Sequence, residues 1–261
     1  MQGKTALITG GARRVGAGIV RELHANGWNI VLHYRSSARE AGVLADELEE
    51  ARPGSVALCR LDLTRTSRLP ELVEAAVVHF GRLDALINNA SSFHAEPVGA
   101  ITEAAWDDLI GSNLKAPLFL AQAAAAELAK VGGAIVNIAD IHAERPMAGF
   151  PVYTIAKAGV AALTRSLARE LAPRVRVNAV APGVNLWPES TTSFDDAERA
   201  RILATIPLGR NGTPADIAQA VRFLLEAPYL TGVVLPVDGG RWSVLGSVVH
   251  HAHHQPHHLA T

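Results

Sequence analysis

Short apolar runs alternate along this chain with longer segments in which apolar and polar positions mix at helical spacing. The runs predict strands over residues 5–9, 29–33, 55–60, 85–88, 134–138, 175–180 and 233–237. Charged amphipathic segments between them, such as residues 38–51 and 69–80, predict helices. Apolar strands separated by helices are typical of a parallel sheet covered on both faces. We therefore predict a single α/β domain, a doubly wound Rossmann-type sheet, over residues 1–246.

Residues 184–213 interrupt this alternation. The segment carries Pro188, Pro207, Gly209 and Gly212 among serines and threonines, and it predicts a loop with a short helix over residues 197–204. Long loops inside compact domains often cover a binding site, so we expect a substrate lid. Residues 247–261 are of low complexity and rich in histidine, which predicts a disordered tail. The tail has no Cys, Asp or Glu to complete a metal site, and we expect no metal.

Composition narrows the class of partner. The chain has 24 basic and 25 acidic residues, a balance that does not favour nucleic acid or a membrane surface. Its single cysteine, Cys59, excludes an internal disulfide and fits a reducing compartment. No apolar run reaches the roughly 20 residues that span a bilayer. The first apolar run reads as a strand rather than as a signal peptide. We expect a cytoplasmic protein that acts on a small molecule.

A glycine-rich turn follows the first predicted strand. Gly10, Gly11 and Gly16 lie there, interleaved with Arg13 and Arg14. Glycines at this point let backbone N–H groups approach phosphate oxygens, and the following helix N-terminus favours negative charge. The turn predicts a dinucleotide site, although a plain strand-to-helix turn is the alternative.

The end of the second predicted strand bears on which nicotinamide cofactor is used. Arg35 and Ser36 stand there, without the carboxylate that binds ribose hydroxyls in NAD sites. Arg35 and Arg13 could together clamp a 2′-phosphate, so we predict NADPH. The alternative is that both arginines are solvated surface residues. After the third strand, Asp62 either meets the adenine or caps a turn.

Tyr153 and Lys157 are four residues apart on a predicted helix, so their side chains share one face. A free phenol has a pKa of about 10, and a neighbouring ammonium group should lower it. The pair therefore predicts a general acid for hydride-transfer chemistry.

Together these motifs resemble the short-chain dehydrogenase/reductase family over residues 4–243. The shared features are the glycine turn, Asn88-Asn89-Ala90, Asn113, the Tyr153/Lys157 pair, Pro182-Gly183 and Asp238-Gly239-Gly240. The resemblance implies that Asn113 holds a water in a proton relay with Lys157. It also implies that Pro182 and Gly183 flank the nicotinamide, and that the chain forms a homotetramer.

Two positions depart from the common family pattern. Arg14 stands where a third glycine is usual, and Asp140 replaces the serine thirteen residues before Tyr153. An ionised carboxylate only accepts hydrogen bonds, so Asp140 disfavours ketone reduction and suits a substrate whose nitrogen is protonated. Both departures resemble the pteridine reductase subgroup, as do residues 33–37, 89–93 and 141–150. The clamp arginine at position 35 is shifted by one residue from that subgroup's usual place.

The subgroup resemblance implies that Phe93 stacks on a pterin whose other face meets the nicotinamide. It also implies that Ser91 and Arg14 contact cofactor phosphate and the pterin edge. Trp187, in the lid, either covers the substrate or packs in the core. His94 and His142 are interpreted as polar wall residues.

The sequence thus predicts an NADPH-dependent reductase of a C=N bond in pterins or dihydropterins, extending to dihydrofolate. The predicted catalytic residues are Asp140, Tyr153, Lys157 and Asn113. The predicted cofactor residues are Gly10, Arg13, Arg14, Val15, Tyr34, Arg35, Ser36, Asp62, Leu63, Asn89, Ala90, Ser91, Tyr153, Lys157, Pro182 and Gly183. The predicted substrate residues are Arg14, Ser91, Phe93, Asp140, Tyr153 and Trp187. The alternatives are a carbonyl or 3-oxoacyl-thioester reductase and a catalytically inactive NADP-binding regulator.

Overall fold

The computed structural model describes residues 3–187 and 195–244 and contains one seven-stranded sheet, all parallel, in the order β3-β2-β1-β4-β5-β6-β7. The strands are β1 (Thr5–Ile8), β2 (Asn29–Tyr34), β3 (Val56–Arg60), β4 (Ala85–Asn88), β5 (Ala134–Ile138), β6 (Arg176–Pro182) and β7 (Val234–Val237). Every predicted strand is present, with ends that differ by a residue or two. The predicted single Rossmann-like α/β domain is confirmed.

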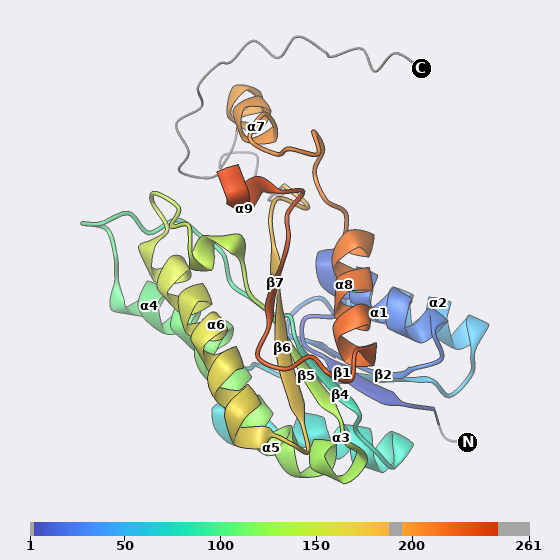
Figure 1. Cartoon of the computed structure of the whole chain (residues 1–261). Coiled ribbons are helices and arrows are strands. Elements are labelled where there is room, and N and C mark those ends of the chain that lie inside the picture. The colour runs from blue at the N-terminus through green and yellow to red at the C-terminus, as the bar shows by residue number, and fades with distance from the viewer. Residues whose placement is uncertain (1–2, 188–194, 245–261) are drawn as a thin grey trace, which may run out of the picture.

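Helices cover both faces of the sheet (Figure 1). The α-helices are α1 (Arg14–Ala25), α2 (Ala38–Ala51), α3 (Pro70–Phe80), α4 (Glu103–Ile110), α5 (Ala116–Val131), α6 (Pro151–Leu171), α7 (Asp196–Leu203), α8 (Pro214–Glu226) and α9 (Arg241–Val244). Single turns η1 (Thr66–Arg68) and η3 (Ile141–Ala143) are 3₁₀, and η2 (Gly111–Lys115) is a π-helical turn between α4 and α5.

Two hydrophobic layers hold the helices to the sheet. Side chains of α1, α2 and α8 form one core with residues such as Ile8 and Ile87. Those of α3, α5 and α6 form the other core with residues such as Leu7 and Leu86. Neighbouring residues of β1 and β4 thus face opposite layers, as alternation along a strand requires. A sheet buried on both sides explains why its strands are apolar throughout.

The strand order reverses at β1, which pairs with β2 on one side and with β4 on the other. In open α/β sheets the crevice for ligands lies beyond the carboxyl ends of the strands at such a reversal. A ligand site is therefore expected at the loops after β1 and β4.

The predicted lid helix is present as α7, which stands with α9 beyond the carboxyl edge of the sheet (Figure 1). The middle of the predicted lid and the predicted disordered tail lie outside the described residues. Within residues 3–187 and 195–244, no cluster of three or more His, Cys, Asp or Glu residues could hold a metal. No helix in that part of the chain is long and apolar enough to cross a membrane.

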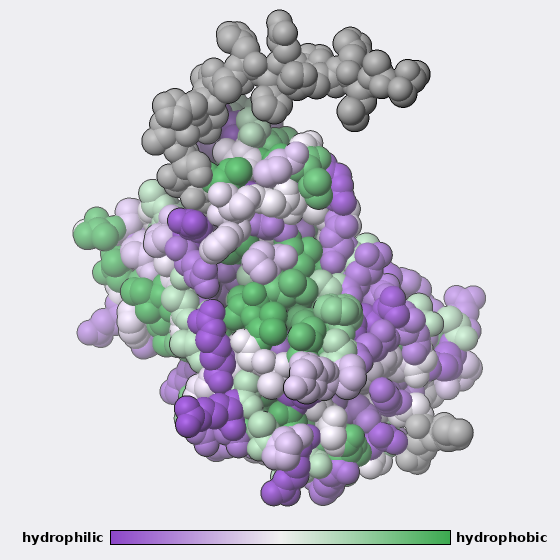
Figure 2. Space-filling view, in the orientation of Figure 1, coloured by the Kyte–Doolittle hydropathy of each residue, from purple (hydrophilic) through white to green (hydrophobic). Residues whose placement is uncertain are grey.

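The last strand, β7, forms one edge of the sheet; Pro236 is exposed and its other residues are only partly buried. Figure 2 shows an apolar patch on this side of the molecule, over β7 and its junction with α8. Phe223 of α8 is 53% exposed.

Candidate active site

A cavity of about 620 Å³ opens at the carboxyl ends of the strands. It is lined by the turn after β1, the ends of β2 and β3, and the loops after β4, β5 and β6, together with α6 and α9. All the predicted cofactor and substrate residues lie in this lining, as do Asp140, Tyr153 and Lys157. Asn113 is the one predicted site residue that is not part of the lining. Residues up to 231 positions apart in sequence thus meet at one site, from Gly10 to Arg241.

The glycine turn brings backbone close to the cavity. Gly10 has φ +62°, and a Cβ added at Gly16 would lie 2.1 Å from the Gly10 carbonyl oxygen and 2.7 Å from Asn89 Nδ2. Only glycines fit this packing of strand, turn and helix. Arg13 precedes α1 with an extended backbone, and its side chain makes no cap hydrogen bond to the helix. The N-terminus of α1 is therefore not capped by that side chain and lies at the cavity.

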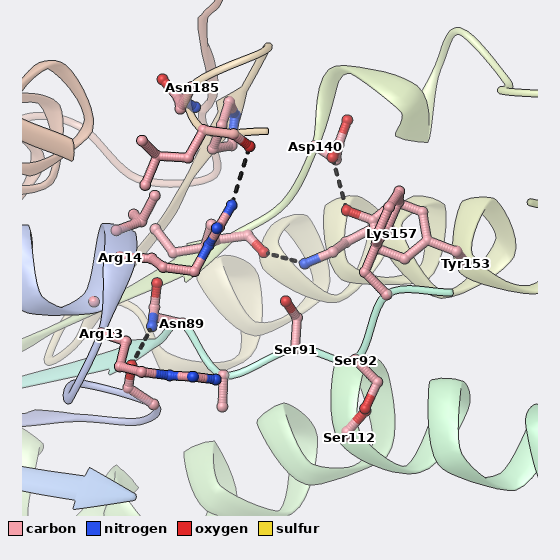
Figure 3. Close-up of a pocket in the computed structure, with 18 of the residues that line it drawn as sticks. Arg13, Arg14, Asn89, Ser91, Ser92, Ser112, Asp140, Tyr153, Lys157 and Asn185 are labelled. Carbon is pink, nitrogen blue, oxygen red and sulfur yellow. Dashed lines mark hydrogen bonds between the residues drawn. The ribbon is translucent and has the colours of Figure 1, made fainter. Parts of the chain in front are cut away.

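Arg14 stands where the third glycine is usual, and it has φ +54°, the left-handed region. This conformation costs a non-glycine residue roughly 1–2 kcal/mol. The guanidinium donates hydrogen bonds to the carbonyl of Leu186 at 3.0 Å and to that of Trp187 at 3.1 and 3.2 Å. The glycine-rich turn is thereby joined to the first residues of the predicted lid segment (Figure 3).

His33, near the end of β2, is fully buried and supports the glycine-rich turn through hydrogen bonds. Its Nδ1 accepts a hydrogen bond from the Gly10 backbone N–H at 3.1 Å, and its Nε2 donates to the Leu61 carbonyl at 3.0 Å. Both bonds together require the neutral ring. Burial lowers the pKa of His33 to about 4, against the opposing effect of the bond to Leu61.

The far end of the cavity is basic. Arg13, Arg35 and Ser36 line it, and no carboxylate stands at the end of β2. Arg35 is more than half exposed and lies 4.0 Å from Asp108, at the limit of an ion pair. Asp62 lines the same end and also caps its turn, with Oδ1 accepting from the backbone and hydroxyl of Thr64 at 3.0 and 2.8 Å. The two interpretations of Asp62 are therefore compatible.

The loop after β4 is held by two asparagines. The Asn89 amide donates to the carbonyls of Thr9 and Gly10, so it fixes the glycine turn from the other side. Asn113, in the π-helical turn η2, accepts from the Ser92 N–H at 3.0 Å and donates to the Ser92 carbonyl at 2.9 Å. The Asn113 side chain is thus occupied in shaping this loop. A water relay, as the family resemblance implies, would have to use its backbone carbonyl.

Phe93, next in this loop, lies at the cavity and is 40% exposed. Its ring stacks on Phe150 with centroids 4.8 Å apart, and it meets the Tyr153 ring edge-on at 4.9 Å. Phe93 is therefore a wall residue of the cavity and not part of either sheet core. Trp187 also lines the cavity, and Arg199 lies over its ring at 5.5 Å.

Helix α6, which carries Tyr153 and Lys157, is fixed at two points. Glu96 is buried, and its Oε1 accepts from the backbone N–H groups of Val152 and Tyr153 at 3.0 and 3.1 Å. Further along, Thr164 accepts from Asn137 of β5, which in turn accepts from Asn88 of β4. A carboxylate at a helix N-terminus satisfies orphan N–H groups and the positive end of the dipole. The helix is therefore locked to the sheet and to the loop after β4.

Three side chains meet at the centre of the cavity (Figure 3). The Tyr153 hydroxyl donates to Asp140 Oδ2 at 2.7 Å, and Lys157 Nζ donates to the Ile138 carbonyl at 2.8 Å. Asp140 Oδ1 accepts from the His142 N–H at 2.8 Å, which holds the carboxylate toward Tyr153. Tyr153 and Lys157 are both buried.

The expectation that Lys157 lowers the pKa of Tyr153 is wrong for this arrangement. Burial and the Asp140 carboxylate, which accepts a hydrogen bond from the phenol, raise the pKa of Tyr153 well above its ordinary value. The Lys157 ammonium points to a backbone carbonyl and lies 5.7 Å from the centroid of the phenol ring. Burial lowers the pKa of Lys157 to about 8, against the opposing effect of Asp140. Tyr153 therefore holds its proton, and Lys157 is the group that titrates near neutrality.

Several residues at or near the site were not predicted. His33 lies in the matched segment 33–37, but its bond to the turn was not predicted, and Glu96 was not predicted at all; the two side chains bond to backbone groups 23 and 57 positions away in sequence. Arg241 lines the cavity from α9 and had no predicted role. Of the two histidines interpreted as wall residues, His142 lines the cavity, whereas His94 lies outside it beside Asp108 and Glu96.

The geometry defines what the site can do. A phenol with its proton in place, a carboxylate that orients it and a lysine that can exchange a proton near neutrality form a proton-supplying unit. A basic end beside the N-terminus of α1 suits an anionic ligand such as a dinucleotide. The two ends belong to one cavity, as hydride transfer from a dinucleotide requires.

Comparison with known proteins supports a nicotinamide-dependent oxidoreductase. A family model described as "Enoyl-(Acyl carrier protein) reductase" matches residues 10–241. Pteridine reductase 1 of Leishmania tarentolae is 36% identical, over 90% of this chain and 95% of that protein. Granaticin polyketide synthase putative ketoacyl reductase 2 of Streptomyces violaceoruber is 37% identical, over 90% of this chain and 94% of that protein.

The 3-oxoacyl-[acyl-carrier-protein] reductase of Staphylococcus aureus is 34% identical, over 92% of this chain and 98% of that protein. These relatives are similar over nearly their whole lengths, yet their names give different substrates. Identity at this level establishes the shared fold and cofactor class but not the compound reduced. This chain belongs to the short-chain dehydrogenase/reductase family, whose members are oxidoreductases that use NAD(H) or NADP(H).

Proposed function

We propose that this protein is an NADPH-dependent reductase of pterins or dihydropterins, including dihydrofolate, which adds hydrogen across a ring C=N bond. The observation that carries the proposal is the hydrogen bond from Tyr153 to Asp140. In a ketone reductase of this family the equivalent position supplies a hydroxyl donor to the carbonyl oxygen. Here a carboxylate occupies it and can only accept, which suits a substrate edge that carries N–H groups.

The donor set of the cavity fits NADPH. Arg13, Arg35 and Ser36 offer donors for a 2′-phosphate, and no carboxylate of β2 would repel it. The N-terminus of α1, open on the cavity side, suits the diphosphate. Pro182 and Gly183, after β6, would border the nicotinamide, and Lys157 would bind its ribose. When bound, NADPH supplies the hydride.

The chain's own residues supply the proton. Tyr153 holds its hydrogen toward Asp140 until a substrate nitrogen takes the position beside it. Hydride addition to the carbon of C=N makes that nitrogen strongly basic, so even a phenol of raised pKa can protonate it. One hydride and one proton convert C=N to CH–NH. Lys157, whose pKa is about 8, then returns a proton toward the phenolate. A water held by the Asn113 carbonyl would reload Lys157.

Phe93 supports a flat substrate. Its partly exposed ring, backed by Phe150, offers a surface on which a pterin could stack. Such stacking contributes about 0.5–1.5 kcal/mol beyond burial. Ser91 and Arg14 would bind the polar edge of the substrate, and Trp187 would cover it from the lid.

The test is a substrate panel with purified protein and NADPH. We expect loss of NADPH absorbance with dihydrobiopterin or dihydrofolate and little with acetoacetyl thioesters. Turnover of the thioesters alone would replace the proposal with a 3-oxoacyl reductase, the activity that two of the relatives' names carry. Tight NADPH binding without turnover of any substrate would indicate an NADP-binding regulator.

We further propose that the protein works as a homotetramer. Trp106 of α4 and Leu118 and Phe119 of α5 are exposed apolar residues, and β7 leaves one sheet edge open. Exposed apolar patches of this kind mark association surfaces. Light scattering should give a mass of four chains. Phe119→Glu should reduce it, whereas Val43→Glu on exposed α2 should not; a monomeric wild type would contradict the proposal.

A further inference from the structure

Arg241 is an unusual residue to find in this cavity. It begins the short helix α9, is 8% exposed and lines the cavity with Asp140, His142 and Ile202. Burial lowers the pKa of its guanidinium, while the carboxylates of Asp140 and Asp238 oppose that effect. Burying a cation is costly unless acceptors surround it.

The described residues provide few acceptors for this guanidinium. Arg241 Nε donates to Thr205 Oγ1 at 2.9 Å. Within residues 3–187 and 195–244, no carboxylate lies close enough for a salt bridge to Arg241, and its terminal NH groups have no hydrogen-bond partner. A guanidinium has five N–H donors, so most of the donor capacity faces the cavity.

The position of Arg241 is well defined. Asp238 accepts from the backbone N–H of Gly240 at 2.9 Å and from that of Trp242, which fixes the turn into α9. The Trp242 ring lies under the Arg145 guanidinium, 5.0 Å from its centroid, and so packs α9 against the loop after β5. Thr205 in turn donates to the Ile202 carbonyl at 2.6 Å. The start of α9 is thus fixed, and Thr205 holds the Nε of the Arg241 guanidinium, so Arg241 is not a mobile surface side chain.

We infer that Arg241 is a substrate-binding residue whose terminal N–H groups donate to an oxygen acceptor of the substrate, a ring carbonyl or a carboxylate. This inference rests on the proposed function for the nature of the substrate. The residue lies on the Asp140 side of the cavity, where the reacting ring would be, and away from the basic end formed by Arg13 and Arg35. Asp140 would then accept a hydrogen bond from an N–H group of the ligand, and Arg241 would donate to an oxygen of the same ligand.

The test compares Arg241→Gln and Arg241→Lys with wild type. Binding to the protein–NADP⁺ complex is measured by calorimetry for a pterin with a ring carbonyl, for a 2,4-diaminopteridine without one, and for folate, which adds a carboxylate. Each lost charge-assisted bond should weaken binding about 10- to 100-fold. Equal losses for pterin and folate, with none for the diamino compound, identify the ring carbonyl as the acceptor. A loss for folate alone identifies the carboxylate.

Controls separate binding from folding. Thr205→Val removes the hydrogen-bond partner of Nε but leaves the terminal N–H groups of Arg241 in place. It should therefore weaken the binding of the three ligands much less than Arg241→Gln does. NADPH affinity and melting temperature should stay near wild type in all variants. The inference would be overturned if Arg241→Gln bound all three ligands as tightly as wild type does. A parallel loss of NADPH affinity would also overturn it.

Failure of the proposed function gives a different result. In that case the wild type binds none of the pteridines and reduces an acetoacetyl thioester. The inference is then tested on that substrate, whose carbonyl oxygens are the acceptors. Arg241→Gln should raise its KM about tenfold or more with unchanged NADPH affinity; an unchanged KM would reject the inference on its own.

Discussion

The hydroxyl of Tyr153 donates a hydrogen bond to Oδ2 of Asp140 across 2.7 Å; Tyr153 is buried, whereas Asp140 is partly exposed at the cavity. Asp140, rather than Lys157, is therefore the charged group that acts on the Tyr153 hydroxyl. Burial and the carboxylate keep the tyrosine protonated, and the lysine is the member that titrates near neutrality.

Replacing Asp140 should separate pterin reduction from cofactor binding. In Asp140→Ser the acceptor becomes a hydroxyl, so kcat for a dihydropterin should fall about 10²-fold or more. NADPH affinity should change little, and activity on simple ketones should appear. The pKa of Tyr153 should fall because the carboxylate charge is gone. Ultraviolet titration in a Tyr34→Phe/Tyr229→Phe background would detect that change, and equal loss of NADPH affinity would contradict the prediction.

The pH profile of reduction should report Lys157. Its pKa is about 8, so the ammonium form that supplies the proton dominates below that pH and is lost above it. We expect kcat to fall as pH rises through about 8. Asp140 raises the pKa of Lys157, so Asp140→Asn should move this limb to lower pH. A limb that stays in place in Asp140→Asn would assign it to another group.

His33 should make stability depend on pH. Its pKa is about 4 in the folded protein and 6.5 in the unfolded chain, so between these values the unfolded chain binds more protons. Stability therefore rises from pH 4 to 6.5 and is lost on acidification, by about 3 kcal/mol from this residue. Urea unfolding across this range measures the slope. His33→Gln should flatten it, whereas His79→Gln on the exposed face of α3 should leave it unchanged.

Protonation of His33 would also cost the hydrogen bond that its Nδ1 accepts from the Gly10 N–H. Affinity for NADPH should therefore weaken at acidic pH in wild type and less in His33→Gln. A parallel acid dependence in both proteins would place the titrating group elsewhere.

Removing Arg35 should alter cofactor preference. If its guanidinium binds the 2′-phosphate, Arg35→Ala should raise the KM for NADPH about 10- to 100-fold and leave that for NADH unchanged. Arg39→Ala, exposed on α2 just beyond the cavity, is the matched control. A wild type that prefers NADH would refute the assignment before any variant is made.

Much of the fold was predictable because its signals are local. Each strand is a short apolar run, and the glycine turn, the end of β2 and the Tyr153/Lys157 spacing each lie within a few residues. Parallel strands gather such points at one edge of the sheet, so nearly all the predicted residues line one cavity.

The remaining features depend on contacts between distant parts of the chain. Burial and Asp140 determine the direction of the pKa shift of Tyr153, and the Lys157 ammonium instead donates to the carbonyl of Ile138, 19 positions away. Glu96 and Arg241 reach the site through tertiary packing, with no spacing that a linear pattern could reveal. The side chain of Asn113 likewise serves a loop 21 positions back, which its family role does not suggest.

The carboxylate of Glu96 has a consequence for redesigning this enzyme. Because it binds the first N–H groups of α6, the loop that carries Phe93 and the helix that carries Tyr153 share one anchor. Mutations that enlarge or reshape the aromatic wall should therefore also displace Tyr153. Variants selected for a bulkier substrate should lose turnover unless Glu96 keeps its place, so libraries at this wall are best built with that residue held constant.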